Sequence, residues 1–331
     1  MMTSDETKSG PEPPGRTSRF ACLDVARGMA LVAMAMFHTG WDLSFLNLLA
    51  VDLSSSPLWR GFAQVIAATF LFIAGASLVL ASRERIVWPA YGRRLAIIMV
   101  AALAVTLATR QVIGEAFVAF GILHHIAVAS LIGLAFLRLP LAIVAMAALI
   151  ALLLPLFAVL PGRGYGAGYF LGLAPEGPAS VDYVPLFPWL SAGLSGILAA
   201  RLGLRLAPDG WWTRWQADRP PFRLLAAMGR WSLAIYLLHQ PLIFGALMMV
   251  AALQPPPPTP AAAPAVQRFH TECRHACIAF GRTVDYCTSA CTCTQAALER
   301  NGLWRQTLDN SLTSAGSHRV QELARACAPA P

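Results

Sequence analysis

Two pairs of ionisable residues stand at the start and near the end of the first long apolar stretch of the chain. Asp24 and Arg27 lie three residues apart, and His38 and Asp42 lie four residues apart. Residues at these spacings share one face of an α-helix, so each pair can act as one local unit. Ionisable groups at membrane depth are costly, and they indicate a functional site by default.

His38 and Asp42 have the chemistry of a general base and its orienting acid. Histidine titrates near neutral pH and suits proton transfer. Asp42 could accept the Nδ1 hydrogen of His38 and hold the ring, as the acid of a catalytic triad does. The alternative is that Asp42 only ends the helix in solvent. Asp24 and Arg27 could form a structural ion pair or contribute to a binding site for a charged ligand at the inner face.

Histidines also occur inside two later apolar segments, as His124 and His125 in one and His239 in the other. A histidine within a membrane can simply be hydrogen-bonded between helices. Three apolar segments that each carry histidine favour a shared site more than one such segment would. Neighbouring residues of a helix point about 100° apart, so only one of His124 and His125 can face a given site.

The composition is that of an α-helical integral membrane protein. The 331 residues are 56% hydrophobic and 13% charged, whereas soluble domains have roughly 25% charged residues. Several apolar stretches approach the roughly 20 residues that cross a hydrocarbon core. The net charge of +8 does not indicate nucleic-acid binding, because most of the arginines flank apolar segments, where membrane topology accounts for them.

We predict an all-α, polytopic transmembrane helix bundle of about seven spans. The predicted spans are Asp24–Gly40, Trp59–Ala81, Arg93–Thr109, Ile113–Leu137, Leu139–Leu160, Pro185–Leu204 and Trp231–Leu253. In the fourth, Glu115 and the glycines leave open that residues 111–120 form a separate short or re-entrant piece.

Arginine positions predict the orientation. Residues 1–19 carry Pro, Gly, Ser and mixed charge without an apolar run, which indicates a disordered cytoplasmic leader and not a signal peptide. Arginines crowd the second-to-third and sixth-to-seventh connections, as positive-inside loops do; they are Arg83, Arg85, Arg93, Arg94, Arg201, Arg205, Arg214, Arg219, Arg223 and Arg230. With seven spans, the Gly/Pro-rich loop 161–183 and the C-terminal tail then lie outside.

The tail is a separate region with its own chemistry. A Pro/Ala-rich linker, 254–266, is expected to be extended, and a Cys-rich tail, 267–331, follows. Six of the seven cysteines lie in this tail, from Cys273 to Cys327. The spacing C-x3-C-x9-C-x3-C, formed by Cys273, Cys277, Cys287 and Cys291, suits two antiparallel helices joined by two disulfides. Cys293 and Cys327 would form a third. The alternative is a zinc site with His270 and His275.

Five sequence blocks resemble one known family in their order and spacing. They are RFACLDVARGMALVAMAMFHTGWDL, TFLFIAGASL, FGILHHIAVASL, DYVPLFPWLSAGLSGI and GRWSLAIYLLHQPL, which together cover about residues 19 to 253. They resemble the DUF1624 family, the heparan-alpha-glucosaminide N-acetyltransferase catalytic-domain family, in its short bacterial form. The wider group of membrane acyltransferases shares an acidic residue and an Arg-Gly at the start of the first helix, and a histidine at its end.

The resemblance implies transfer of an acyl group from acyl-CoA, typically acetyl-CoA, to a sugar amine or hydroxyl of an envelope glycan. Acetyl-CoA would be a co-substrate, with no bound cofactor and no metal. His38 would be the general base and Asp42 would orient it. Asp24 and Arg27 would structure the CoA side, where Arg93 and Arg94 could meet phosphates or serve only as anchors.

The same resemblance assigns the remaining polar groups to the acceptor's path. His124 or His125 and His239 would line it. Asp182 and Trp189 would lie outside, where the glycan arrives, although a tryptophan at a span boundary is also an ordinary interface anchor. The location implied is the bacterial inner membrane, with a cytoplasmic N-terminus and a periplasmic tail.

Two other functions fit the residues alone. A transporter could use the histidines as a proton relay, although the inverted repeat typical of transporters is not evident in the sequence. A non-enzymatic scaffold could bind a partner through the tail. The partners expected are the lipid bilayer and the saccharide; self-association into a homo-oligomer is left open.

Overall fold

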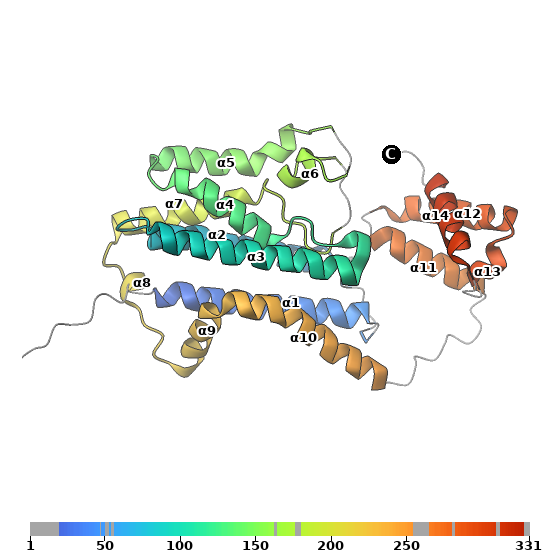
Figure 1. Ribbon diagram of the computed structural model, residues 1–331, viewed down its shortest axis with the longest axis horizontal. Coiled ribbons are helices and arrows are strands. Elements are labelled where there is room, and N and C mark those ends of the chain that lie inside the picture. Colours follow the sequence, from blue (N-terminus) through green and yellow to red (C-terminus); the bar gives the residue numbers. More distant parts are fainter. Residues whose placement is uncertain are drawn as a thin grey trace, which may run out of the picture. The chain divides into compact units, whose positions relative to one another are not determined.

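The computed structural model describes residues 20–46, 48–49, 53, 56–161, 164–175, 180–253, 265–279, 282–308 and 312–327. Within these ranges the chain is helical and contains no strand (Figure 1). The all-α prediction is therefore confirmed. The predicted leader and nearly all of the Pro/Ala-rich linker lie outside the described residues.

Each predicted span overlaps one of the helices. The helices are α1 (Ala21–Phe45), α2 (Pro57–Ala81), α3 (Trp88–Ile113), α4 (Ile122–Phe136), α5 (Leu141–Phe157), α7 (Leu190–Leu206) and α10 (Ser232–Leu253). Four of them, α1, α2, α3 and α10, are long and apolar enough to cross a membrane, and α4 and α5 are shorter apolar helices. The chain is accordingly a multi-pass membrane protein.

The fourth span differs from its predicted bounds. The apolar run that begins at Ile113 is not one helix, because α3 continues to Ile113 and is followed by a single 3-10 turn, η1 (Gly114–Ala116). Gly114 ends α3 with φ +70°, a conformation that glycine adopts without steric cost. Helix α4 begins only at Ile122, so residues 111–120 form a helix end and a turn.

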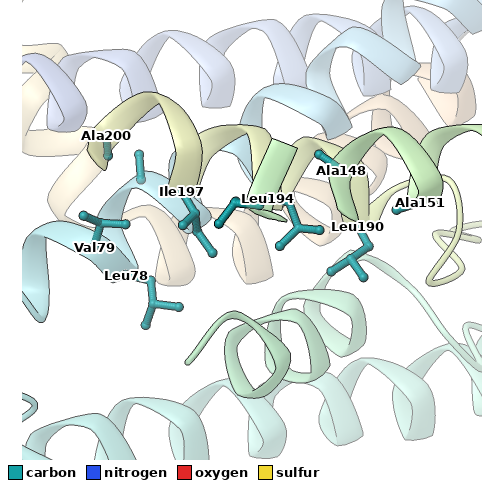
Figure 2. Packing of buried hydrophobic residues seen from close by; sticks show 10 residues of the cluster. Leu78, Val79, Ala148, Ala151, Leu190, Leu194, Ile197 and Ala200 are labelled. Carbon is teal, nitrogen blue, oxygen red and sulfur yellow. The ribbon is translucent and has the colours of Figure 1, made fainter. Parts of the chain in front are cut away.

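The chain divides into two compact units. The first comprises Met1–Met34 and Ile66–Leu238, and the second comprises Ala35–Val65 and His239–Pro331. The core of the first unit lies among α2, α5 and α7 (Figure 2), and its buried members are Ala76, Leu78, Val79, Val144, Ala148, Ala151, Leu190, Leu194, Ile197 and Ala200. Alanines occur on all three helices in this list, and such small residues allow helices to approach closely.

Glycines set the closest helix approaches of the first unit. A Cβ added to Gly75 of α2 would collide with the carbonyl oxygen of Gly193, and one added to Gly196 of α7 would collide with that of Phe72. Gly229 of α9 (Pro220–Arg230) lies in the same way against the Asp24 carbonyl oxygen of α1. Such backbone-to-backbone packing is typical of helices in lipid, where small residues form the contacts.

Other helix faces remain apolar and exposed. On α3 these exposed side chains include Val100, Leu103 and Leu107, and on α10 they include Leu242 and Met249. In a bilayer such faces meet lipid tails, since an apolar solvent imposes no penalty on them.

The described part of the Cys-rich tail contains four helices: α11 (Ala265–Ala279), α12 (Val284–Arg300), α13 (Trp304–Leu308) and α14 (Ser314–Ala326). Disulfides Cys273–Cys291 and Cys277–Cys287 join α11 to α12, and Cys293–Cys327 joins α12 to the end of α14. The structure thus contains the predicted helical hairpin with its two bridges, together with the third. Cys287, Cys291 and Leu298 are fully buried within this lobe.

We expect the Cys293–Cys327 disulfide to hold α14 in the lobe. Cys327→Ser should destabilise the lobe by about 3–4 kcal/mol, the loop-entropy value for a loop of this length. Limited proteolysis of the full chain should then cut within residues 301–326 much faster than in the wild type. Equal cleavage rates in the two proteins would contradict this role for the disulfide.

Candidate functional site

Two imidazole rings lie close together in the second unit, in an edge-to-face arrangement. His38 of α1 and His239 of α10 have ring centroids 5.0 Å apart, with the ring planes at 61°. The edge of the Phe37 ring lies against His38 at 5.3 Å. The structure therefore brings together two histidines that the sequence separates by two hundred residues.

Asp42 is tied to α10. Its side chain is fully buried, and its Oδ1 accepts a hydrogen bond of 3.0 Å from Nε2 of Gln240. Its Oδ2 is buried and has no hydrogen-bond partner among the described residues. The Asp42 carboxylate is therefore bound to Gln240, the residue that follows His239 on α10. A hydrogen bond between Asp42 and His38, which the sequence suggested, is not formed.

Aromatic rings flank this group of residues. Trp59 of α2 stacks on Phe37 with centroids 5.4 Å apart, and Phe62 lies 5.7 Å from Trp59. Nε1 of Trp59 and Oε1 of Gln240 are buried and lack hydrogen-bond partners within the described part of the chain. Buried polar atoms without partners are costly, and water, an ion or a bound ligand can supply the missing bonds. We call His38, Asp42, Trp59, His239 and Gln240 the histidine cluster.

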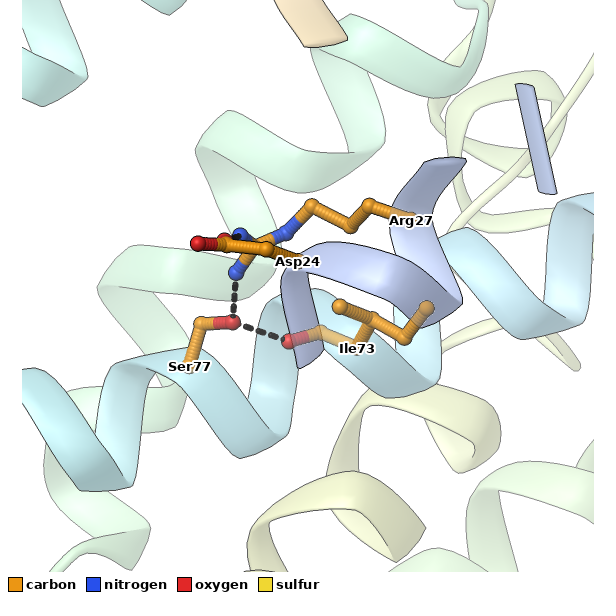
Figure 3. Close-up of polar contacts among 4 residues, drawn as sticks. All are labelled: Asp24, Arg27, Ile73 and Ser77. Atoms are coloured by element: carbon orange, nitrogen blue, oxygen red, sulfur yellow. Dashed lines mark hydrogen bonds and ion pairs between the residues drawn. The ribbon is translucent and has the colours of Figure 1, made fainter. Parts of the chain in front are cut away.

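A second polar group lies in the first unit, at the start of α1 (Figure 3). Nη1 of Arg27 forms an ion pair of 2.9 Å with Oδ1 of Asp24, and Nη2 of Arg27 donates to Oγ of Ser77 on α2. Ser77 in turn donates to the carbonyl oxygen of Ile73 at 2.5 Å. The predicted Asp24–Arg27 pair therefore exists and fixes α1 to α2.

Replacement of either Asp24 or Arg27 alone should lower the free energy of unfolding. Arg27→Gln leaves the buried Asp24 carboxylate without a counter-charge, so we expect a loss of about 3–5 kcal/mol of unfolding free energy. The double variant Asp24→Asn/Arg27→Gln should lose clearly less than the sum of the two single losses. Thermal unfolding of the three variants in detergent measures this coupling; strictly additive losses would contradict it.

The arginines predicted to bind CoA lie at the start of α3. Arg93 and Arg94 are both exposed. The charge of Arg94 acts on the Arg27 guanidinium, so Arg94 belongs to the electrostatic surroundings of the Asp24–Arg27 pair. Arg27 and Arg94 together with the Asp24 carboxylate carry a net positive charge.

The two adjacent histidines of α4 have different partners. Nδ1 of His124 accepts from the Gly121 backbone N–H at 3.3 Å, and its Nε2 lies 3.2 Å from Oγ1 of Thr106 on α3. His125 is fully buried, and its Nδ1 lies 3.1 Å from the Pro185 carbonyl oxygen. His124 therefore caps α4, and His125 ties α4 to the loop before α7. Neither contact requires a substrate.

Asp182 also caps α4. Its Oδ2 accepts from the backbone N–H of Ile122 at 3.2 Å and from the hydroxyl of Tyr236 at 3.3 Å. Burial raises the pKa of the Asp182 carboxyl, and these two hydrogen bonds oppose that rise. Trp189, just before α7, packs against Leu71, Ile122 and Val184. Both residues, predicted to lie on the acceptor's path, hold the loop and helix ends together.

Three partners of the site were not singled out from the sequence: Gln240, Trp59 and Ser77. Gln240 directly follows His239, so a polar pair inside an apolar span was the available signal. A tryptophan at the start of an apolar span is commonly an interface anchor, and a serine inside a span is commonly a packing residue, so neither Trp59 nor Ser77 gave a distinct signal. Only the tertiary arrangement shows that each contacts a predicted residue or its neighbour.

Comparison with known proteins identifies the family of the chain. A profile of the family described as "Heparan-alpha-glucosaminide N-acetyltransferase, catalytic" matches residues 19–241. The match begins just before α1 and ends just after His239 and Gln240, so it includes both polar groups and excludes the Cys-rich tail. Searches of curated proteins and of solved structures gave no significant match. The chain belongs to the heparan-alpha-glucosaminide N-acetyltransferase catalytic-domain family.

Proposed function

We propose that this membrane acetyltransferase moves an acetyl group from acetyl-CoA to an amine or hydroxyl of an envelope saccharide, with His38 as the general base. Membership of the family supplies the reaction class. The single observation that carries the assignment to His38 is the histidine cluster, in which an imidazole stands among buried polar atoms that have no partner in the described chain.

His38 would take the proton of the acceptor as the acceptor attacks the thioester carbonyl carbon. A base must lie within hydrogen-bond reach of the proton that it removes. The unpartnered Oδ2 of Asp42 and Oε1 of Gln240 would accept hydrogen bonds from the acceptor, while the Trp59 N–H would donate one. The rings of Phe37, Trp59 and Phe62 offer the apolar surface on which a sugar ring can lie.

The Asp24–Arg27 pair would contribute to binding of the donor. Arg27, Arg93 and Arg94 offer guanidinium groups of the kind that bind phosphates, and CoA carries several phosphate groups. The hydrogen bonds that Arg27 donates to Asp24 and to Ser77 would orient its guanidinium. In this proposal the N-terminus and these arginines face the cytoplasm of a bacterial inner membrane and the Cys-rich tail faces the periplasm, where disulfides persist.

Label transfer from radiolabelled acetyl-CoA tests the proposal. Purified wild-type protein in detergent would be given a panel of amino sugars, neutral sugars and envelope glycans. We expect labelled acceptor in at least one case and saturable acetyl-CoA binding. If acetyl-CoA neither binds nor donates its label, the acetyltransferase proposal fails, and a proton-relay transporter becomes the better account of the histidines.

A further inference from the structure

We propose that His239 is a second catalytic residue, the general acid that protonates the departing CoA thiolate, while His38 acts as the base. This inference rests on the proposed acetyl transfer and deepens it. It begins from the ring contact of His38 and His239, with centroids 5.0 Å apart. Two imidazoles this close can act on the same thioester, one on the attacking acceptor and the other on the leaving sulfur.

The arrangement favours a state in which only one of the two rings, His38 or His239, is protonated to imidazolium. Two imidazolium ions at this separation would repel each other in a site that excludes water. The Asp42 carboxylate supplies one negative charge to the cluster, held by the hydrogen bond from Gln240. The Asp42 carboxylate therefore balances one imidazolium charge in the cluster, whereas a second imidazolium would have no counter-charge there.

The proton count of the reaction then balances, because the His38–His239 pair holds one imidazolium proton before and after acetyl transfer. Neutral His38 takes the proton from the acceptor as the acceptor's nitrogen or oxygen bonds to the carbonyl carbon. The carbon–sulfur bond breaks, its electron pair goes to sulfur, and protonated His239 gives its proton to that sulfur. His38 is then the charged ring, and transfer of one proton from His38 to His239 restores the starting state.

The two rings lie on different helices, which fits separate roles for His38 as general base and His239 as general acid. His38 lies one turn before Asp42 on α1, and His239 lies beside Gln240 on α10, so the Asp42–Gln240 hydrogen bond joins the turns that carry the two rings. A variant of either ring leaves that bond in place. The two roles can therefore be separated by mutation.

Kinetics with acetyl-CoA give the first test. We expect His239→Gln to lower kcat by about 10²-fold or more, as loss of a general acid does, with an unchanged KM for acetyl-CoA and unchanged thermal stability. A histidine that only lines the substrate path would instead raise KM and leave kcat, and that result would overturn the proposal. His275→Gln, an exposed histidine of the Cys-rich lobe, is the matched control.

The leaving group gives the second test. A nitrophenyl thioester releases a thiolate that needs no proton, so His239→Gln should lose less than about 10-fold with S-acetyl-4-nitrothiophenol. His38→Asn should lose activity equally with both donors. Equal losses of His239→Gln with both donors would overturn the proposal. Absence of any transfer by the wild type from acetyl-CoA would instead refute the proposed function itself.

Discussion

Replacement of His38 by asparagine is expected to lower kcat for acetyl transfer by about 10²–10⁴-fold, the usual contribution of a general base. Asparagine keeps a planar polar group of similar reach but cannot accept a proton at neutral pH. The rings around it, Phe37 and His239, retain a neighbour of comparable size. Initial rates with radiolabelled acetyl-CoA and the best acceptor measure the effect.

Two controls make this result specific. His275→Asn changes a histidine outside the matched family region and should keep wild-type rates. Thermal unfolding of His38→Asn should stay near that of the wild type, because His38 is replaced by a residue that fits its space. Wild-type activity in His38→Asn would show that another residue removes the proton of the acceptor.

Replacement of Gly196 by alanine is expected to destabilise the first unit by about 3 kcal/mol, near the upper end of the cost of overpacking. The added Cβ collides with the backbone carbonyl of Phe72 on α2. A backbone atom cannot rotate away as the end of a side chain can, so α2 and α7 must separate and weaken the cluster of Leu194 and Ile197. Thermal unfolding in detergent should show a markedly lower midpoint.

Gly193, on the same helix, provides the matched control. Its added Cβ would meet only the Leu71 carbonyl oxygen, at an ordinary contact distance of 3.9 Å. Gly193→Ala should therefore be neutral or stabilising by up to about 1 kcal/mol, since alanine is the better helix former. Equal destabilisation by the two variants would contradict the claim that the close approach of the Phe72 carbonyl oxygen to Gly196 is what makes the Gly196 substitution costly.

Much of the fold followed from the sequence because hydropathy and cysteine spacing are local signals. Apolar runs near 20 residues indicated each of the predicted spans, and the x3 spacing placed Cys273 and Cys277 on one face of α11. The boundary between α3 and α4 was predicted only as an alternative, since Glu115 and the glycines left open that residues 111–120 form a separate piece, while the predicted span bounds placed the start of the fourth span at Ile113 instead of Ile122. The turn depends on the positive φ of Gly114, which hydropathy does not reveal.

The site was only partly predictable. The Asp24–Arg27 pair lies within one helix turn, and its spacing was sufficient. The partner of Asp42, by contrast, lies 198 residues away at Gln240, and no periodicity connects the two. His124 illustrates the opposite case, since a histidine that resembled a site residue serves to cap the N-terminus of α4.

In the proposed reaction, the chain carries an acetyl group from CoA on one side of a membrane to a saccharide on the other, at His38. The most direct test uses proteoliposomes with the acceptor sealed inside and radiolabelled acetyl-CoA added outside. We predict labelled acceptor inside vesicles that hold the wild type, and none above background with His38→Asn. Equal labelling by the two proteins, or no labelling by a wild type that binds acetyl-CoA, would contradict the account.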